Sequence, residues 1–290
     1  MLRNDRHGLI SRRVIVRWAT FVVGISVFGS AVNGESRLIT VASTTSTENS
    51  GLFAYLLPLF TADTGIDVRV VAVGTGQAIR LAANGDADVL FVHHPPSEHK
   101  FVADDLGLER HAVMHNDFVL VGSAADPAGV RGMTDVVAAL NLISTGGHAF
   151  VSRGDDSGTH KKELTLWEAA ETDPRPASGT WYRETGSGMG ASLNTASGMD
   201  AYALTDRATW VRFGNKGHLE ILVEGDARLH NPYGIIVVNP ERHAHVHAAE
   251  AQALVEWLMS ERGQKEIAAY RVGGRQLFFP DALPGQAGEK

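Results

Sequence analysis

The stretch "IDVRVVAVGTGQAIRLAANGDADVLFVHH", residues 66–94, decides the fold. It opens with an apolar, β-branched run, passes through a glycine-rich turn into a mixed segment, and ends in a second apolar run, "DVLFVHH". The two runs are typical of β-strands, and the segment between them is typical of a helix. Two strands that are joined through a helix pair in parallel, so the stretch predicts a βαβ unit.

The same pattern extends toward the N-terminus. The run "RLITVAS", residues 37–43, predicts a strand, and it is followed by apolar residues at helical spacing that Gly65 brings to an end. Strand and helix therefore alternate as βαβαβ. This order predicts an α/β fold with mainly parallel sheets flanked by helices.

Later segments continue the alternation. Residues 117–124 and 233–239 predict two apolar strands, and residues 244–270 predict one long C-terminal helix. Between them lies a second α/β region. The Pro-rich stretch at residues 172–179 predicts a surface loop.

The order of these segments favours two lobes over two domains in series, with the chain crossing between lobes near residues 117–125 and 229–236. We expect the first lobe to contain residues 35–117 and 234–290, and the second lobe to contain residues 118–233. A ligand cleft is expected between the lobes.

The first 34 residues predict an export signal. Five arginines precede the apolar run "WATFVVGISVFGSAV", which is too short to span a bilayer comfortably, so a cleaved signal peptide is favoured over a membrane anchor. The chain has no cysteine, which excludes a lipid-modified N-terminal cysteine, a disulfide and a thiolate metal site. These features predict a mature protein free in the periplasm.

Composition narrows the ligand class. The 290 residues are 44% hydrophobic and 20% charged, with a formal net charge of −7. No general basic surface is available for nucleic acid or anionic lipid. Any bound anion must therefore be held by local groups.

Three strand-to-helix junctions combine glycines with hydroxyl residues: "ASTTSTENSG" (42–51), "VGTGQA" (73–78) and "SRGDDSGTH" (152–160). Backbone N–H groups point outward at such helix starts and can hold an anion. The three junctions together predict a cradle for a small oxyanion.

The first two junctions offer neutral donors. Thr45 and Glu48 form a capping-box pattern, and Ser46 belongs to a run of more hydroxyls than one cap requires. Thr75 precedes a helix, and Gly76 permits close approach of the backbone to a ligand. The alternative interpretation is a well-capped helix and an ordinary turn.

The third junction adds the charge. Arg153 can pair with an oxyanion through two hydrogen bonds, while Ser157, Gly158 and Thr159 begin a helix with hydroxyl and N–H donors. The alternative is an Arg–Asp surface pair beside a capped helix. A hydrolase with Ser157 as nucleophile and His160 as base is a further alternative, but the G-x-S-x-G elbow is absent. No catalytic residue is therefore predicted.

Thirteen histidines raise the question of a metal site. His243 and His247 have the i, i+4 spacing that places two imidazoles on one helix face, but no HExxH motif accompanies them. We predict an exposed helix start there, and neither a metal nor a cofactor. The roles of His93 and His94 stay open.

The sequence closely resembles the tungstate-binding proteins of ABC importers, which are two-lobed periplasmic receptors. The resemblance implies a type II periplasmic-binding-protein fold, an ABC permease and ATPase as partners, and a monomer. Seven segments carry it in the expected order, from residue 38 to about residue 240: "TTSTENSGLF", "VGTGQAI", "DVLFVHHPPSE", "NDFVLVG", "FVSRGDDSGTHKKE", "LTDRATW" and "NPYGIIVVNP". The oxyanion ligands that it implies are Thr45, Ser46, Thr75, Gly76, Arg153, Ser157, Gly158 and Thr159.

Phosphate-binding receptors are the competing family, because their R-x-D-x-S-G-T signature also fits residues 153–159. Phosphate carries a proton at neutral pH and needs a carboxylate acceptor, whereas tungstate and molybdate are fully deprotonated. The expected place for that acceptor reads "FVHHPP" and holds no acid, which favours tungstate or molybdate without separating the two. Asp155 either orients Arg153 or accepts a proton from phosphate.

Overall fold

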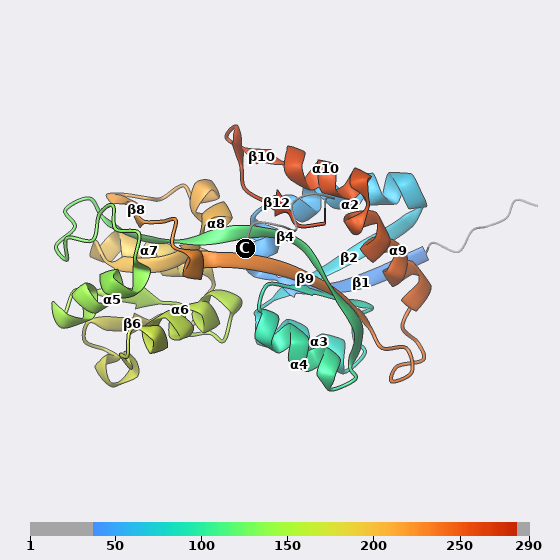
Figure 1. The fold of residues 1–290 in the computed structure, drawn as a ribbon, viewed down its shortest axis with the longest axis horizontal. Coiled ribbons are helices and arrows are strands. Elements are labelled where there is room, and N and C mark those ends of the chain that lie inside the picture. The colour runs from blue at the N-terminus through green and yellow to red at the C-terminus, as the bar shows by residue number, and fades with distance from the viewer. Residues whose placement is uncertain (1–36, 283–290) are drawn as a thin grey trace, which may run out of the picture. The chain divides into compact units, whose positions relative to one another are not determined.

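The predicted βαβαβ unit is present at the start of the fold (Figure 1). The structure is a computed structural model that describes residues 37–282. Strand β1 (Arg37–Thr44) pairs in parallel with both β2 (Ile66–Val73) and β3 (Val89–Val92). Helix α2 (Leu52–Thr64) leads from β1 to β2, and α3 (Thr75–Ala83) leads from β2 to β3. This unit belongs to the first lobe.

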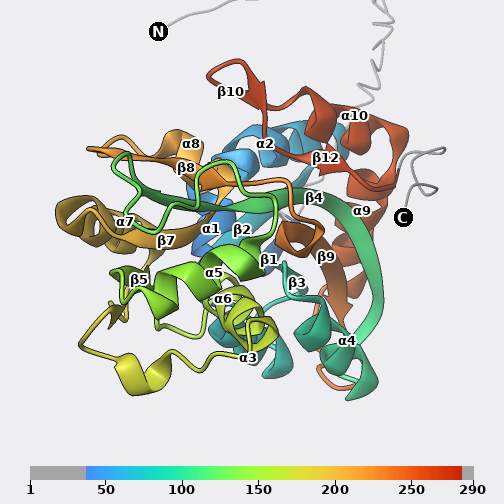
Figure 2. The same cartoon turned by 60° about the vertical axis from the view of Figure 1, so that its left-hand side comes forward.

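Two long strands cross from the first lobe into the second. They are β4 (Gly107–Ser123) and β9 (His230–Val238), which run antiparallel side by side with Asn116 opposite Asn231 (Figures 1 and 2). Strand β4 begins ten residues earlier than the sequence predicts. Each lobe is therefore tied to the other through the backbone ladder of these two strands.

The second lobe repeats parallel pairing on a smaller scale. Strand β5 (Phe150–Ser152) pairs in parallel with β6 (Tyr182–Glu184) and with β7 (Tyr202–Asp206). Strands β7 and β8 (Leu219–Val223) pair antiparallel with β4.

The α/β class is confirmed, and the strand order of the large sheet is β2-β1-β3-β9-β4-β7-β5-β6. Parallel pairing holds at both ends of this sheet. The crossing strands add antiparallel pairs in its middle, because β4 and β9 pass between the lobes in opposite directions.

Hydrophobic residues form separate cores on the two sides of the crossing strands. Ile39, Phe60 and Trp257 belong to the first-lobe core, and Trp167 and Tyr182 belong to the second-lobe core. The remaining helices lie around these cores: α4 (Pro95–Ala103), α5 (Val136–Thr145), α6 (Gly158–Ala169), α7 (Met189–Met199) and α8 (Arg207–Arg212). The predicted lobe boundaries at 117/118 and 233/234 fall within β4 and β9, and their exact positions stay a prediction.

The C-terminal helix is not continuous, and that prediction is wrong. It consists of α9 (Ala248–Met259) and α10 (Glu261–Ala269), separated by Ser260. The Ser260 hydroxyl accepts the Gly263 N–H, so it starts a new helix instead of continuing the old one. The short strands β10 (Arg271–Val272), β11 (Arg275–Gln276) and β12 (Phe279–Pro280) follow.

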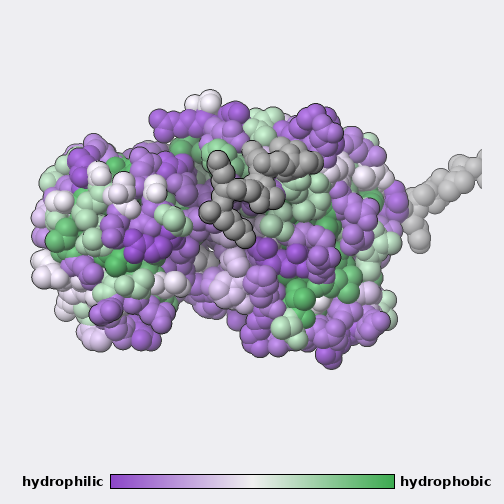
Figure 3. Space-filling model, viewed as in Figure 1, coloured by the Kyte–Doolittle hydropathy of each residue, from purple (hydrophilic) through white to green (hydrophobic). Residues whose placement is uncertain are grey.

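The surface of the described part is largely hydrophilic on the face in Figure 3, where apolar residues form scattered groups. Among residues 37–282 no helix is both long enough and apolar enough to cross a membrane. The predicted signal peptide, residues 1–34, lies outside the described residues.

Candidate functional site

The start of α3 leaves donors free on the first lobe. Its N-cap is Gly74, which has no side chain to satisfy the first-turn N–H groups. Thr75 is fully buried, and within residues 37–282 its Oγ1 has no hydrogen-bond partner. This helix start therefore presents a buried hydroxyl and unpaired backbone N–H groups.

The start of α6 provides the matching surface on the second lobe. Ser157 is the N-cap, and its Oγ accepts the His160 N–H at 3.2 Å. Thr159 is 1% exposed, and its Oγ1 also lacks a partner among the described residues. Ser157 Oγ thus uses an acceptor site for the helix start and keeps its own proton to donate, and Thr159 retains a hydroxyl without a partner among the described residues.

The two helix starts meet at Gly158. A Cβ atom at this residue would lie 3.0 Å from Thr75 Oγ1 and 2.7 Å from Cε1 of His93. A side chain at this position would force the buried His93 ring or Thr75 to move, so glycine permits this close approach. Gly76 makes a second close contact, where an added Cβ would meet the Asp156 carboxylate.

Arg153 lies buried at the end of β5, with 3% of its side chain exposed. Its Nη2 donates to Asp155 Oδ2 at 2.5 Å, and Asp155 Oδ1 accepts the Ser157 N–H at 3.2 Å. The Nε of Arg153 has no partner among the described residues. Asp155 therefore orients Arg153 through Nη2 and leaves the Nε–H of the guanidinium available as a donor.

The first junction differs from its prediction. Thr44, not Thr45, is the N-cap of α1 (Thr45–Asn49), so the predicted capping box of Thr45 and Glu48 was placed one residue too late. Thr45 is partly exposed, whereas Ser46 is buried. The shift follows from β1, which continues through Thr44 by pairing with Val73.

Sequence reasoning did not assign His93, which the fold brings into the site. Its ring is 4% exposed, with Nε2 3.1 Å from Ser46 Oγ and Nδ1 2.9 Å from Asn231 Oδ1. Burial lowers the pKa of His93 to about 4, and the Arg153 guanidinium contributes in the same direction. The imidazole is therefore neutral at pH 7.

Asp206 is a second residue whose role in the site was missed. Its Oδ1 accepts the Thr209 N–H as the N-cap of α8. It is also 1% exposed and close enough to Arg153 for the guanidinium to act on its pKa, which burial raises overall. The segment FVHHPP holds no acid, but a buried carboxyl from β7 lies near the guanidinium.

A small cavity of about 120 Å³ borders this cluster. His93, Gly158, Lys162 and Asn231 are among the residues that line it. A space of this volume holds only a few water molecules and suits a small ligand.

Comparison with known proteins identifies the family of the chain. A family model described as the PBP superfamily domain matches residues 31–262. The tungstate-binding protein TupA of Peptoclostridium acidaminophilum is 48% identical over 248 residues, which make up 84% of this chain and 86% of that protein.

The chain belongs to the tungstate-binding family of the PBP superfamily.

Solved structures in this tungstate-binding family have the same fold. TupA from Desulfovibrio alaskensis G20 is 45% identical, with a TM-score of 0.75, over 85% of this chain and 100% of that chain. The tungstate ABC transporter from Geobacter sulfurreducens is 47% identical, with a TM-score of 0.74, over 80% of this chain and 98% of that chain.

In this member of the tungstate-binding family, Ser157 and His160 make contacts unlike those of a nucleophile and its base. Ser157 Oγ accepts the His160 N–H, and Nδ1 of His160 accepts the Asp156 N–H at 3.2 Å. Both side chains are thus engaged with backbone groups.

The other histidines that were considered have structural contacts. His243 Nε2 lies 2.9 Å from the Ala83 carbonyl, and both His243 and His247 precede α9 instead of lying on it. No group of three or more His, Cys, Asp or Glu in residues 37–282 is arranged to hold a metal ion. His94 caps α4 by accepting the Ser97 N–H.

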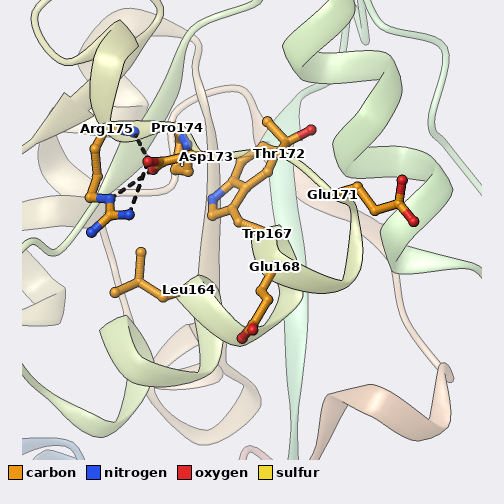
Figure 4. Close-up of a pocket in the computed structure, with 8 residues that line it drawn as sticks. All are labelled: Leu164, Trp167, Glu168, Glu171, Thr172, Asp173, Pro174 and Arg175. Carbon is orange, nitrogen blue, oxygen red and sulfur yellow. Dashed lines mark hydrogen bonds and ion pairs between the residues drawn. The ribbon is translucent and has the colours of Figure 1, made fainter.

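A more open pocket, of about 430 Å³, lies at the other end of α6 (Figure 4). Trp167 and Leu164 border it, and Arg175 pairs there with Asp173. This arginine is exposed and already pairs with Asp173 in its own loop. An anion would therefore gain little binding energy there compared with its hydration in water. The cluster around Arg153 is the better candidate site for the tungstate-binding family's ligand.

Proposed function

We propose that this protein captures tungstate, or the closely similar molybdate, between its lobes and delivers it to an ABC permease with its ATPase. The observation that carries the proposal is that three of the buried donors without partners among the described residues belong to the two helix starts and to Arg153: Thr75 Oγ1, Thr159 Oγ1 and Arg153 Nε. An unpaired buried donor costs about 1–3 kcal/mol, so a ligand that accepts from all three would be strongly favoured.

The donors suit a small oxyanion. They come from both lobes, and they join the N-termini of α3 and α6, where unpaired N–H groups favour negative charge. We propose Ser46, Thr75, Gly76, Arg153, Gly158 and Thr159 as contacts, with Ser157 holding the helix start. Thr45, which is partly exposed, is the weakest of the predicted contacts.

Relatives named as tungstate-binding proteins support tungstate as the ligand. Asp206 is the observation that favours phosphate instead, because a buried carboxylate near Arg153 could accept a hydrogen bond from the proton of hydrogen phosphate. Tungstate offers no such proton. The identity of the anion is therefore the first thing to measure.

The proposed setting follows the same relatives. We propose an exported protein that acts in the periplasm after loss of residues 1–34, as a monomer and without a cofactor. Binding and release, with no covalent chemistry, are the whole of the proposed activity.

Calorimetric titration of the purified mature protein with tungstate, molybdate, sulfate and phosphate tests the proposal. We expect tungstate to bind with a dissociation constant of about 1 μM or tighter, and sulfate to bind far more weakly. Tight binding of phosphate with no response to tungstate would show that phosphate, not tungstate, is the ligand. No response to any of the four anions would overturn the receptor function.

A further inference from the structure

The hydroxyl of Ser46 has one proton, and two groups need it as a hydrogen-bond donor: Nε2 of His93 and the proposed oxyanion. Its Oγ lies 3.1 Å from Nε2 of His93 and 3.0 Å from Thr44 Oγ1, a hydroxyl that can donate to it. Ser46 also lies in the first turn of α1, the helix start that we propose faces the oxyanion. A hydroxyl donates only one hydrogen bond. The way in which Ser46 divides its proton therefore depends on His93.

The neighbouring amides fix the tautomer of His93. Nδ2 of Asn231 donates to Asn116 Oδ1 at 2.6 Å, so its Oδ1 faces Nδ1 of His93 as an acceptor. Nδ1 of His93 must then carry the proton. In the neutral ring Nε2 is an acceptor, and Ser46 donates to it.

The cationic side chains that act on His93 are Arg153, after β5, and Lys162, on α6. The adjacent His94 is neutral at pH 7, because burial lowers its pKa to about 4, and the rings of Tyr233 and Phe118 pack against the imidazole of His93. Burial is the main reason that the pKa of His93 is about 4, and the two cations act in the same direction, whereas the hydrogen bond with Asn231 raises this pKa without outweighing burial. The imidazole is therefore neutral at pH 7 before an anion arrives.

A bound dianion changes this balance. It brings two negative charges to a site whose guanidinium is already paired with Asp155 and lies near Asp206. It also requires hydrogen-bond donors, and a Ser46 hydroxyl that turns toward it would leave Nε2 of His93 buried without a partner. One added proton on Nε2 satisfies both requirements.

We propose that His93 takes up one proton from solvent when a dianionic oxyanion binds, so that the imidazolium donates to Ser46 Oγ and Ser46 donates to the anion. The inference rests on the proposed function, because it needs Ser46 to face the ligand. His93 is thus a positioning residue that acts through Ser46 and supplies a positive charge only in the filled site.

The sign of the pH dependence follows from the rise in the His93 pKa on binding. Between the pKa of the empty protein, about 4, and the higher pKa of the complex, binding consumes a proton. The association constant for tungstate should therefore fall, by up to about tenfold per pH unit, as the pH rises through that window. Above the pKa of the complex it should become constant.

Proton uptake can be counted directly. Tungstate is titrated calorimetrically at about pH 7 in buffers of different ionisation enthalpy, and the slope of observed enthalpy against buffer enthalpy gives the protons exchanged. We expect uptake of about one proton in the unchanged protein. We expect uptake near zero in His93→Gln, whose amide can still donate to Asn231 and accept from Ser46.

His99→Gln is the matched control, because His99 lies on α4 close in sequence but is exposed. It should leave the uptake unchanged. Nitrogen NMR of histidine-labelled protein gives an independent readout, with the His93 signals assigned by their loss in His93→Gln. Tungstate should convert them from one protonated and one bare nitrogen to two protonated nitrogens.

The outcomes separate the two proposals. If the unchanged protein binds no oxyanion, the proposed function fails. If it binds tungstate with no proton uptake, or if uptake persists in His93→Gln, the function stands and the His93 inference is overturned. A folded His93→Gln protein, checked by thermal unfolding, is a condition for this comparison.

Discussion

The two helix N-termini that meet in the site are built differently. Helix α3 begins at Gly74 without a side-chain cap and carries no charge in its first turn. Helix α6 begins at a capped Ser157 and is preceded by the ion pair of Arg153 and Asp155. The first lobe thus offers neutral donors, and the second lobe adds the guanidinium.

This difference teaches how an anion could hold the lobes together. If each lobe carried a charged residue, each lobe alone would attract an anion. Neutral donors on one lobe interact strongly only with an anion that the other lobe already holds. This difference between the lobes predicts that substitutions of Gly158, of Arg153 and of the two threonines weaken anion binding by different amounts.

The largest effect is expected at the contact itself. Gly158→Ala places a methyl group against the His93 ring and Thr75 Oγ1, at 2.7 and 3.0 Å. We expect tungstate affinity to fall by roughly a hundredfold, because overpacking of this kind costs about 1–3 kcal/mol. Gly190→Ala, at the start of α7 with nothing within 4 Å, is the control. Equal affinity of the two variants in calorimetry would show that close approach is not needed.

The next effect is expected at the charge. Arg153→Ala removes the guanidinium that acts on His93, and a charge-assisted hydrogen bond contributes about 1.5–3 kcal/mol. We expect at least a tenfold loss of tungstate affinity by calorimetry, without global unfolding. Arg175→Ala removes an exposed, paired arginine and should change nothing. Unchanged affinity in Arg153→Ala would mean that the second lobe holds the anion without it.

A smaller effect separates the two hydroxyls. Thr75→Val and Thr159→Val remove donors that have no partner among the described residues. Each should weaken tungstate binding about fivefold and, at the same time, raise the melting temperature of the ligand-free protein. A fall in both quantities would indicate that the hydroxyl has a structural role. Thermal unfolding with and without tungstate gives both measurements.

The smallest effect on binding is expected behind the second-lobe site, at Glu163. Burial raises its pKa to about 7, although Tyr182 and Trp167 donate to its Oε1. The folded state therefore holds this proton more tightly than the unfolded state. Stability should fall as the pH rises from the ordinary carboxyl range to about 7, by on the order of 2 kcal/mol.

Glu163→Gln keeps both hydrogen bonds to Oε1 and removes this titration. The decline in stability with pH, measured by denaturant unfolding, should become shallower, and tungstate affinity should stay unchanged. Glu98 on the first lobe also has its pKa raised by burial to about 7, but it pairs with Arg110, so part of the decline will remain. A pH profile identical to that of the unchanged protein would show that Glu163 is ionised in the fold.

Local chemistry made part of this structure predictable. Gly65 ends α2 at a φ of 68°, a conformation that favours glycine, and Ser157 caps α6 through its own hydroxyl. Errors occurred where neighbours decide: β1 extends through Thr44 because β2 pairs with it, and Ser260 divides the last helix.

The sequence by itself determined the alternation of strands and helices, the uncapped and capped helix starts, and the presence of Arg153 beside Asp155. These features depend on residues a few positions apart. Only the tertiary structure decided that His93 contacts Ser46 and Asn231, 47 and 138 residues away, and that Asp206 lies near Arg153. Such contacts follow from which strands pair, and pairing is fixed by the burial of whole sheets, not by any local motif.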